Sequence, residues 1–314
     1  MFDLSVFFLT MQKVAFHLIF IFAGYLLRRS GKLGKSSTGT VSVLTTFLFA
    51  PAYSIVNLSQ TFTVENLGSN LAIAGLSLLL LPFIIIFARF LAGRFAKDDF
   101  EKRTFSYMFA FANTGYFGYP VIQGVFGEEM LSRFMVFCLP LNLAINSYGY
   151  SLFLSAKGGF SLKKTLLSPL MIGCYAGCFL GLTGLEIPPL LGDTLSGAAS
   201  CMSPASMILA GLVMGAFPLK KLLSGLRPYL LGAVRLLLIP AVFALPLYFC
   251  GVRGIYLFLS LVTMAMPTGM NIVIYPESLG LDASDNAKFC FVSTLTSILT
   301  LPVVFALAKA VSGL

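Results

Sequence analysis

An apolar part of the chain is interrupted by the stretch Ala110-Phe-Ala-Asn-Thr-Gly-Tyr-Phe-Gly-Tyr-Pro120, which brings together an amide, two glycines and a proline. Pro120 lacks a backbone N–H and obstructs the carbonyl four residues earlier, whereas Gly115 and Gly118 permit non-helical dihedral angles. Unpaired backbone groups are costly in hydrocarbon, so a break there survives only where it faces protein, water or a ligand. We therefore predict a broken membrane helix whose break is a binding feature.

A second interruption, Met266-Pro-Thr-Gly-Met-Asn-Ile-Val-Ile-Tyr-Pro276, has the same character. Thr114 and Thr268 each precede a glycine and are 154 positions apart. Pro51 and Pro204 each precede an alanine and are 153 positions apart. These offsets predict two halves of five helices, which must be inverted in the membrane because five is odd. The alternative is a membrane protein whose prolines merely kink its helices.

The composition around both interruptions is that of a membrane protein. Of the 314 residues, 58% are hydrophobic and 11% are charged, and the mean hydropathy is +0.92. A spanning helix needs ~20 apolar residues. We predict an all-α integral membrane protein with a single membrane domain over residues 1–314. Its ten transmembrane helices are expected at 4–27, 39–59, 68–93, 104–126, 131–154, 167–185, 189–216, 228–250, 254–275 and 286–311.

The net charge of +9 reflects topology rather than nucleic-acid binding. Of the 21 lysines and arginines, 17 fall on one predicted face, which the positive-inside rule makes cytoplasmic. Both termini are then extracytoplasmic, in a multi-pass protein of the plasma (inner) membrane, and the first segment reads as a retained helix. The last loop on the predicted cytoplasmic face is acidic, which weakens the assignment for that loop without overturning the total. The cytoplasmic set is Arg28, Arg29, Lys32, Lys35, Arg89, Arg94, Lys97, Lys102, Arg103, Lys157, Lys163, Lys164, Lys220, Lys221, Arg227, Arg235 and Lys288.

The sequence predicts neither a cofactor nor a metal site. Its six cysteines lie in or beside apolar segments, away from the single histidine and the acidic residues. We expect Lys13 to reach the outer surface, His17 to satisfy a carbonyl, and Glu277 to be a solvated loop charge. No segment centre contains Asp or Glu, which favours movement driven by the membrane potential over proton or sodium coupling.

The two interruptions together predict a site for a small organic anion. Half-helix N-termini carry partial positive charge, and asparagine and threonine side chains add hydrogen-bond donors. Each asparagine has the alternative role of holding helices together. Asn142 and Asn146, four residues apart, share an interior helix face. The predicted substrate-binding residues are Asn113, Thr114, Gly115, Tyr119, Pro120, Asn142, Asn146, Pro267, Thr268, Gly269 and Asn271.

These motifs, with Ser203-Pro204-Ala205 and Thr300-Leu-Pro302, resemble the auxin efflux carrier family over essentially the whole chain. Bacterial members of that family include presumed malate and malonate permeases. The resemblance implies a fold similar to that of bile-acid symporters, with helices 4 and 9 crossed and Asn113, Pro120 and Pro267 at the crossover. It also implies scaffold helices 1, 2, 6 and 7 and transport helices 3–5 and 8–10, within repeats at 1–155 and 167–314. The short 155–166 connection makes a dicarboxylate or related acid a better substrate than auxin.

The leading hypothesis is an elevator-type secondary carrier of small carboxylates, not an enzyme, since no protease or serine-elbow motif is present. The alternatives are an ion or solute channel, a sodium- or proton-coupled organic acid symporter of the same fold, and a membrane sensor or assembly subunit. The expected partners are the anion and the bilayer. Glycines at four-residue spacing allow close helix packing, within one chain or in a homodimer through scaffold helices. They are Gly173, Gly177, Gly181, Gly211 and Gly215.

Overall fold

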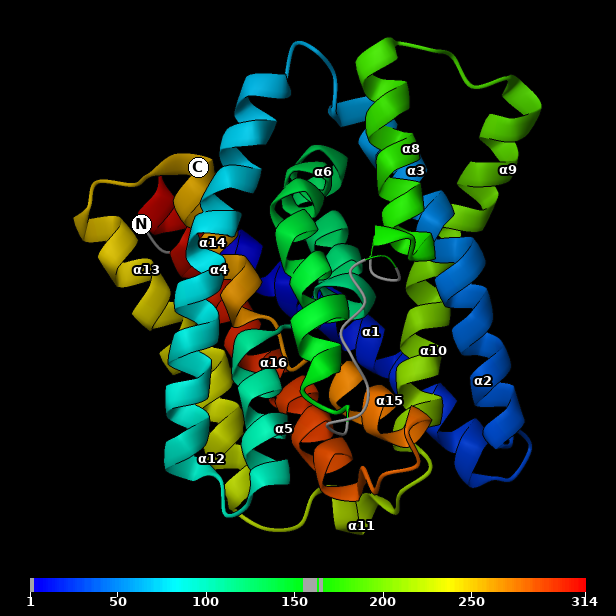
Figure 1. Ribbon diagram of the computed structural model, residues 1–314, viewed down its shortest axis with the longest axis vertical. Coiled ribbons are helices and arrows are strands. Elements are labelled where there is room, and N and C mark those ends of the chain that lie inside the picture. The colour runs from blue at the N-terminus through cyan, green and yellow to red at the C-terminus, as the bar shows by residue number, and fades with distance from the viewer. Residues whose placement is uncertain (1–2, 155–162, 164–165) are drawn as a thin grey trace.

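The computed structural model describes residues 3–154, 163 and 166–314, and every regular element in these ranges is helical (Figure 1). Among the described residues, two apolar helices are short, Pro169–Thr183 and Gly254–Ala265, and seven stretches are long and apolar enough to cross a membrane. The chain is therefore a multi-pass membrane protein, as its hydropathy predicts. The seven stretches are Leu4–Arg29, Lys35–Thr61, Leu67–Phe95, Thr114–Gly149, Pro189–Met214, Arg227–Phe249 and Ser284–Ser312.

Three of the seven stretches are each a single uninterrupted α-helix. These are α1 (Leu4–Arg29), α4 (Leu67–Phe95) and α16 (Ser284–Ser312). The stretch Thr114–Gly149 is interrupted at Gly127, whose φ of 83° is non-helical, between the two spans predicted at 104–126 and 131–154. The shorter helices are α5 (Asp99–Ala110), α8 (Pro169–Thr183), α9 (Pro189–Ser200), α10 (Met202–Met214), α11 (Leu219–Leu222), α14 (Gly254–Ala265) and α15 (Asn271–Ser278).

The stretch Pro189–Met214 consists of α9 and α10, and the other three stretches contain π-turns, in which a backbone N–H reaches the carbonyl five residues earlier. Three of these turns end two residues before a proline, at Pro51, Pro120 and Pro240. Proline cannot donate a hydrogen bond and crowds the carbonyl four residues earlier, so the wider turn absorbs the change of register. The composite helices are α2 (Lys35–Leu44), η1 (Thr45–Phe49) and α3 (Ala50–Thr61); η2 (Thr114–Gly118), α6 (Tyr119–Ala144) and η3 (Ile145–Gly149); and α12 (Arg227–Ala233), η4 (Val234–Leu238) and α13 (Ile239–Phe249).

The helix is lost between α5 and η2 and between α14 and α15, at the two interruptions in the sequence. These two extended segments lie against each other, joined by an antiparallel bridge between Ala112 and Thr268. The backbone N–H of Asn113 donates to the Pro267 carbonyl over 2.8 Å. One detail of the prediction is wrong: Gly115 and Gly118 do not supply the non-helical angles. Both lie in η2, and the chain departs from helix at Phe111–Asn113 because backbone pairing with the second segment holds it extended.

Small residues hold two helix pairs together within the chain. Gly24 and Gly211 bring α1 and α10 into backbone contact, and a Cβ on Gly211 would collide with the Ile21 carbonyl oxygen. On α8, Gly173 and Gly177 face α3, where a Cβ on Gly173 would lie 2.6 Å from the Pro51 Cα atom. The spacing of these glycines therefore serves internal packing, which resolves the choice that the sequence left open for them.

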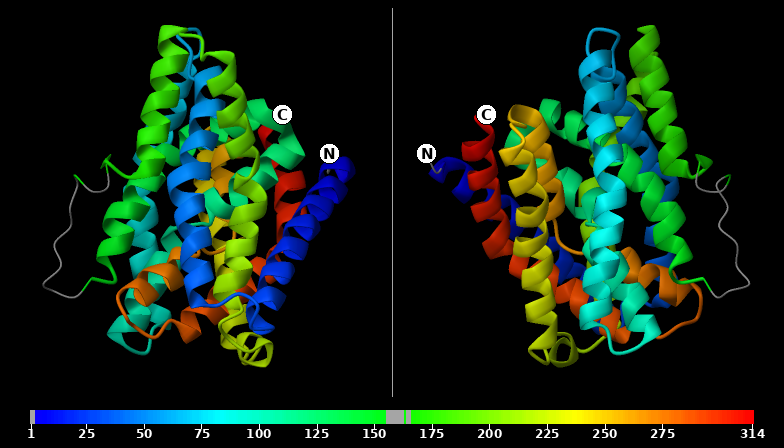
Figure 2. Two further views of the ribbon diagram at one scale, coloured as in Figure 1. Left: turned by 90° about the vertical axis from the view of Figure 1, so that its right-hand side faces the viewer. Right: turned by 60° about the vertical axis from the view of Figure 1, so that its left-hand side comes forward.

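Ion pairs tie together segments that are distant in the sequence. Lys309 Nζ lies 2.8 Å from Asp3 Oδ2, so the two ends of the chain lie on the same side of the molecule (Figure 2). The hydrogen bond from Lys309 holds the pKa of Asp3 well below its usual value. Arg227 binds both carboxylate oxygens of Glu101, at 2.5 and 2.7 Å. Burial of Glu101 opposes its ionisation, but the bonds from Arg227 and from the Lys97 backbone keep its pKa below the usual value.

Arg235 does not lie where the charge pattern predicts. The sequence placed it among the cytoplasmic cations, but it lies inside η4 with no exposed surface. Residues three and four apart share one face of a helix. Arg235 therefore lies on the same interior face as Leu231, Gly232 and Ile239, which are also buried. Two other members of the predicted cytoplasmic set, Lys157 and Lys164, lie outside the described residues.

Candidate functional site

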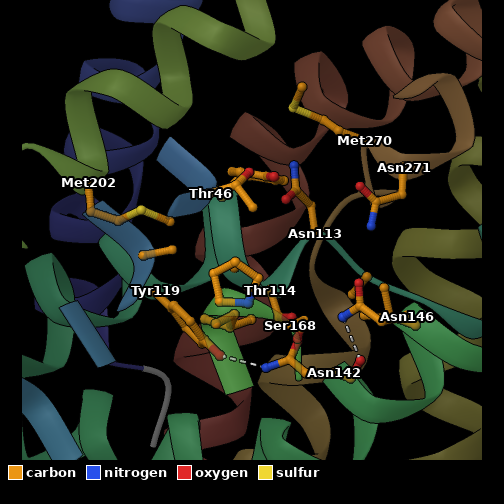
Figure 3. Close-up of a pocket in the computed structure, with 18 of the residues that line it drawn as sticks. Thr46, Asn113, Thr114, Tyr119, Asn142, Asn146, Ser168, Met202, Met270 and Asn271 are labelled. Carbon is orange, nitrogen blue, oxygen red and sulfur yellow. Dashed lines mark hydrogen bonds between the residues drawn. The ribbon is translucent and has the colours of Figure 1, made fainter. Parts of the chain in front are cut away.

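A cavity of about 130 Å³ opens where the two extended segments meet (Figure 3). It is bounded by both interruptions and by residues of η1, α6, η3, α8 and α10. The amides of Asn113, Asn271, Asn146 and Asn142 lie along one side of it, whereas Met202 lies on the other (Figure 3). The lining residues are Thr46, Ala50, Tyr107, Ala112, Asn113, Thr114, Gly115, Tyr116, Tyr119, Asn142, Ile145, Asn146, Ser168, Pro169, Leu170, Met202, Gly269, Met270 and Asn271.

Eight of the eleven residues predicted to bind substrate line this cavity, and three do not. Pro267 gives its carbonyl to the Asn113 backbone, and Pro120 is buried behind η2. Thr268 is fully buried and its backbone N–H donates to Ser293 Oγ over 3.2 Å. Pro267 and Thr268 thus fix the second segment through backbone hydrogen bonds. The lining residues are Asn113, Thr114, Gly115, Tyr119, Asn142, Asn146, Gly269 and Asn271. Whether they bind a substrate stays a prediction.

Asn113 is placed by its backbone. Its N–H pairs with Pro267 and its carbonyl accepts from the Gly118 N–H over 2.9 Å, so the residue is fixed at the first turn of η2. The side chain makes none of the hydrogen bonds found among the described residues, and it points toward the cavity (Figure 3). Both η2 and α15 begin at the cavity without a side-chain cap. The partial positive charge of both helix starts therefore lies at the cavity, although in α15 the N–H groups of Ile272, Val273 and Ile274 already donate to the carbonyls of Gly269 and Met270.

A chain of hydrogen bonds links the two halves of the site. Asn271 Nδ2 donates to the Tyr275 hydroxyl over 3.0 Å, and that hydroxyl donates to Asn146 Oδ1 over 3.3 Å. Asn146 Nδ2 donates to the Asn142 carbonyl over 2.8 Å, and Asn142 Nδ2 donates to the Tyr119 hydroxyl over 3.0 Å. The amides of α15, η3 and α6 therefore hold one another in a fixed orientation.

The cavity has an uncharged lining in which polar groups are set among apolar ones. Its described lining residues include four asparagines, several hydroxyls and no ionisable acid, base or histidine other than tyrosine. No group of three or more His, Cys, Asp or Glu residues that could hold a metal ion occurs in the described residues. Neutral amides and hydroxyls orient a ligand by hydrogen bonds without burying a fixed charge against it.

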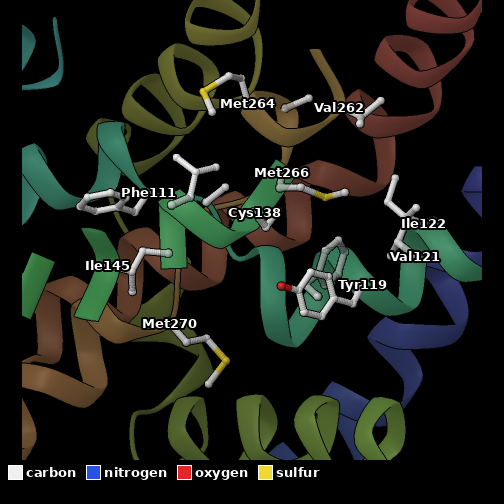
Figure 4. Close-up of a cluster of buried hydrophobic side chains, with 14 of the residues drawn as sticks. Phe111, Tyr119, Val121, Ile122, Cys138, Ile145, Val262, Met264, Met266 and Met270 are labelled. Atoms are coloured by element: carbon white, nitrogen blue, oxygen red, sulfur yellow. The ribbon is translucent and has the colours of Figure 1, made fainter. Parts of the chain in front are cut away.

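Buried apolar side chains form a cluster around the two extended segments (Figure 4). Val121, Ile122 and Cys138 come from α6, and Met264 comes from α14, all almost fully buried. Met266, in the second extended segment, has no exposed surface. Close packing in this cluster keeps water out and holds the extended backbone in place.

Several lining residues were missed by the reasoning from sequence. Thr46, Ser168 and Met202 belong to the segments around η1, α8 and α10, for which the resemblance implies only a scaffold role. A weak signal existed, because the repeated proline motifs at Pro51 and Pro204 lie within a few residues of Thr46 and Met202. Nothing local in the sequence, however, indicated that these helices would reach the broken segments.

Sequence comparisons show what this chain resembles. The sequence pattern of a family described as membrane transport protein matches residues 9–162 and 155–305. An uncharacterized transporter of Methanothermobacter thermautotrophicus is 26% identical over 298 residues, which is 91% of this chain and 94% of the relative. An uncharacterized transporter of Methanocaldococcus jannaschii is 24% identical over 301 residues, which is 93% of this chain and 96% of the relative.

Proposed function

Because this chain belongs to the membrane transport protein family, to which the auxin efflux carriers also belong, we propose that it is a secondary carrier of small organic anions. The family and the matched relatives are membrane transporters and not enzymes. The proposed binding site is the cavity between the two broken helices. One observation supports it most: two helix N-termini without a side-chain cap and four asparagines border the same cavity.

The chemistry of this space suits a carboxylate. Helix N-termini attract negative charge, and backbone N–H groups and asparagine amides donate to carboxylate oxygens. The absence of an aspartate or glutamate from the described lining means that nothing there repels an anion. A bound carboxylate would occupy donors that the described protein groups leave unused, such as the amide of Asn113.

The size of the cavity favours a small acid. Its volume of about 130 Å³ is close to that of a protein cavity of about 150 Å³ that holds one benzene molecule. A short mono- or dicarboxylate is of that size, whereas an indole acid or a bile acid is considerably larger. We therefore favour short mono- and dicarboxylates, with larger acids requiring an open form of the site.

The finer architecture is part of the same proposal. Ten transmembrane helices in two inverted repeats, at 1–155 and 167–314, fit the paired interruptions and the paired proline motifs. The cavity borders both predicted scaffold segments (η1, α8, α10) and predicted transport segments (η2, α6, α15), which is the position an elevator mechanism requires. The plasma membrane location, external termini and a scaffold-mediated homodimer also stay proposals.

Replacing Asn113 tests this function directly. We expect Asn113→Ala to lower the uptake of radiolabelled short carboxylates into proteoliposomes at least tenfold, because a charge-assisted hydrogen bond contributes about 1.5–3 kcal/mol. Asn66→Ala, the same change at an exposed position outside the cavity, is the control and should transport normally. Wild-type uptake that Asn113→Ala leaves unchanged would refute the site. Flux at channel rates, or uptake that requires a sodium or proton gradient, would favour the alternative mechanisms.

A further inference from the structure

The interior contains one charge that the cavity does not explain. Arg235 is the only Asp, Glu, Lys or Arg among the buried residues of the described chain, with 0% of its surface exposed. It follows Arg227, which pairs with Glu101, by eight positions, or about 12 Å along the helix. This depth places the guanidinium well inside the membrane-spanning stretch Arg227–Phe249.

No carboxylate of the chain balances this charge. All twelve aspartates and glutamates lie within the described residues, and none is within ion-pair distance of Arg235. Its Nε, Nη1 and Nη2 atoms have no hydrogen-bond partner there. A guanidinium stays protonated in proteins, and removing an unpaired charge from water is strongly unfavourable. Ionisable groups at such depth are functional candidates by default, because nothing about folding favours them.

Arg235 lies one helix away from the proposed binding site. Its turn, η4, packs against α16 and α14. One turn earlier, a Cβ on Gly232 would lie 3.9 Å from the Cα of Ser293, and Ser293 Oγ accepts the Thr268 N–H on the far side. Gly269, the next residue, lines the cavity. Since a helix is about 10 Å wide, Arg235 and the cavity are separated by roughly that distance.

This inference rests on the proposed function. We propose that the charge of Arg235 makes the uncharged cavity selective for anions, although the side chain does not touch the substrate. The cavity itself supplies shape and hydrogen bonds, whereas Arg235 supplies an attraction that grows with the negative charge of the ligand. At that separation of roughly 10 Å and an effective dielectric constant of about 20, Coulomb's law gives an effect on the order of tenfold in affinity per negative charge. The ligand class is therefore mono- and dianionic carboxylates, with dianions preferred.

A ligand series of constant shape isolates this effect. Malonate, malonamate and malonamide carry two, one and no negative charges at neutral pH, and their binding can be measured by thermal shift or calorimetry of the whole purified protein. We expect Arg235→Gln to weaken malonate about a hundredfold and malonamate about tenfold, and to leave malonamide unchanged. Arg235→Lys, which keeps the charge but not the planar donor group, should bind all three like the wild type.

Two further variants separate electrostatics from folding. Arg94→Gln removes the same charge from an exposed position, where screening by solvent makes the expected effect small. Arg235→Met keeps the apolar bulk, and we expect its thermal stability without ligand to equal or exceed that of the wild type, because no buried charge remains. It replaces Arg235→Gln in the ligand series if that variant does not fold.

Each outcome decides something. Equal loss of all three ligands in the Gln and Met variants would assign Arg235 a purely structural role and overturn the proposal. Unchanged malonate binding in either variant would also overturn it, while leaving the carrier function intact. If the wild type binds none of the three compounds, the proposed function fails for short carboxylates and the inference fails with it.

Discussion

Tyr275 connects Asn271, at the second interruption, to Asn146 in η3. Its hydroxyl accepts from Asn271 and donates to Asn146, so one oxygen atom joins α15 to η3. We expect Tyr275→Phe to raise the KM for transported carboxylates at least about fivefold, because the change removes both part-buried hydrogen bonds of that oxygen and each contributes about 0.5–1.5 kcal/mol. Initial uptake rates over a range of substrate concentrations measure this change.

The control for this change is Tyr229→Phe. That hydroxyl bonds the Leu223 carbonyl outside the cavity, so its removal should leave KM unchanged. A normal KM in Tyr275→Phe would show that the amides hold their orientation without the tyrosine.

At the scale of single residues, the sequence indicated most of the polar lining residues but not the hydrogen bonds between them. The Tyr-Pro motif identified Tyr275 as a neighbour of a helix break, and only the structure shows which amides it reaches.

At the scale of whole helices, close packing between two of them depends on single glycines. A Cβ on Gly211 would collide with the Ile21 carbonyl and lie 2.7 Å from the Tyr25 backbone nitrogen. Backbone atoms cannot move aside as a flexible side chain does, so α1 and α10 must separate. We expect Gly211→Ala to destabilise the protein by about 1–3 kcal/mol, the usual range for overpacking. Thermal unfolding in detergent is the measurement.

Gly197 on α9 is the matched control for this substitution. A Cβ there would meet nothing within 4 Å, so Gly197→Ala should be neutral or stabilise the helix by up to about 1 kcal/mol. Equal unfolding temperatures for the two variants would mean that the α1–α10 contact is looser than the structure indicates.

The helix breaks show where local reasoning succeeds and where it stops. Proline predicted both interruptions, because the missing N–H is a property of one residue. The position of the break within the first segment was predicted wrongly, since Gly115 and Gly118 are helical. Pairing of Phe111–Asn113 with residues more than 150 positions away decides that position, and glycine freedom at one site contains no information about it.

At the scale of the whole molecule, the distribution of charge is the basis for the driving force that we expect. The described interior contains no Asp or Glu, which are the groups that couple carriers to protons or sodium. We expect an imposed inside-negative potential of 100 mV to shift the steady-state distribution of a monoanion outward by about 50-fold, from ~2.3 kcal/mol per charge. Proteoliposomes with a potassium diffusion potential provide the measurement.

Arg235 leaves this expectation unchanged, because the net charge that crosses per cycle is that of the substrate alone. Arg235→Gln should therefore show the same steady-state distribution while binding anions more weakly. Accumulation that follows a sodium or proton gradient and ignores the potential would contradict uncoupled transport.

The sequence by itself determined that lipid surrounds this chain, that its elements are helices and that two of them break. These features depend on the length of apolar runs and on the chemistry of single prolines, which act over a few residues. Only the tertiary structure decided which helices enclose the cavity, which glycines pack against backbone, and that Arg235 is buried and not at the surface. Each of these features depends on contacts between residues far apart in the chain. The pattern of charges and the spacing of residues along the sequence do not indicate which distant atoms will surround a side chain.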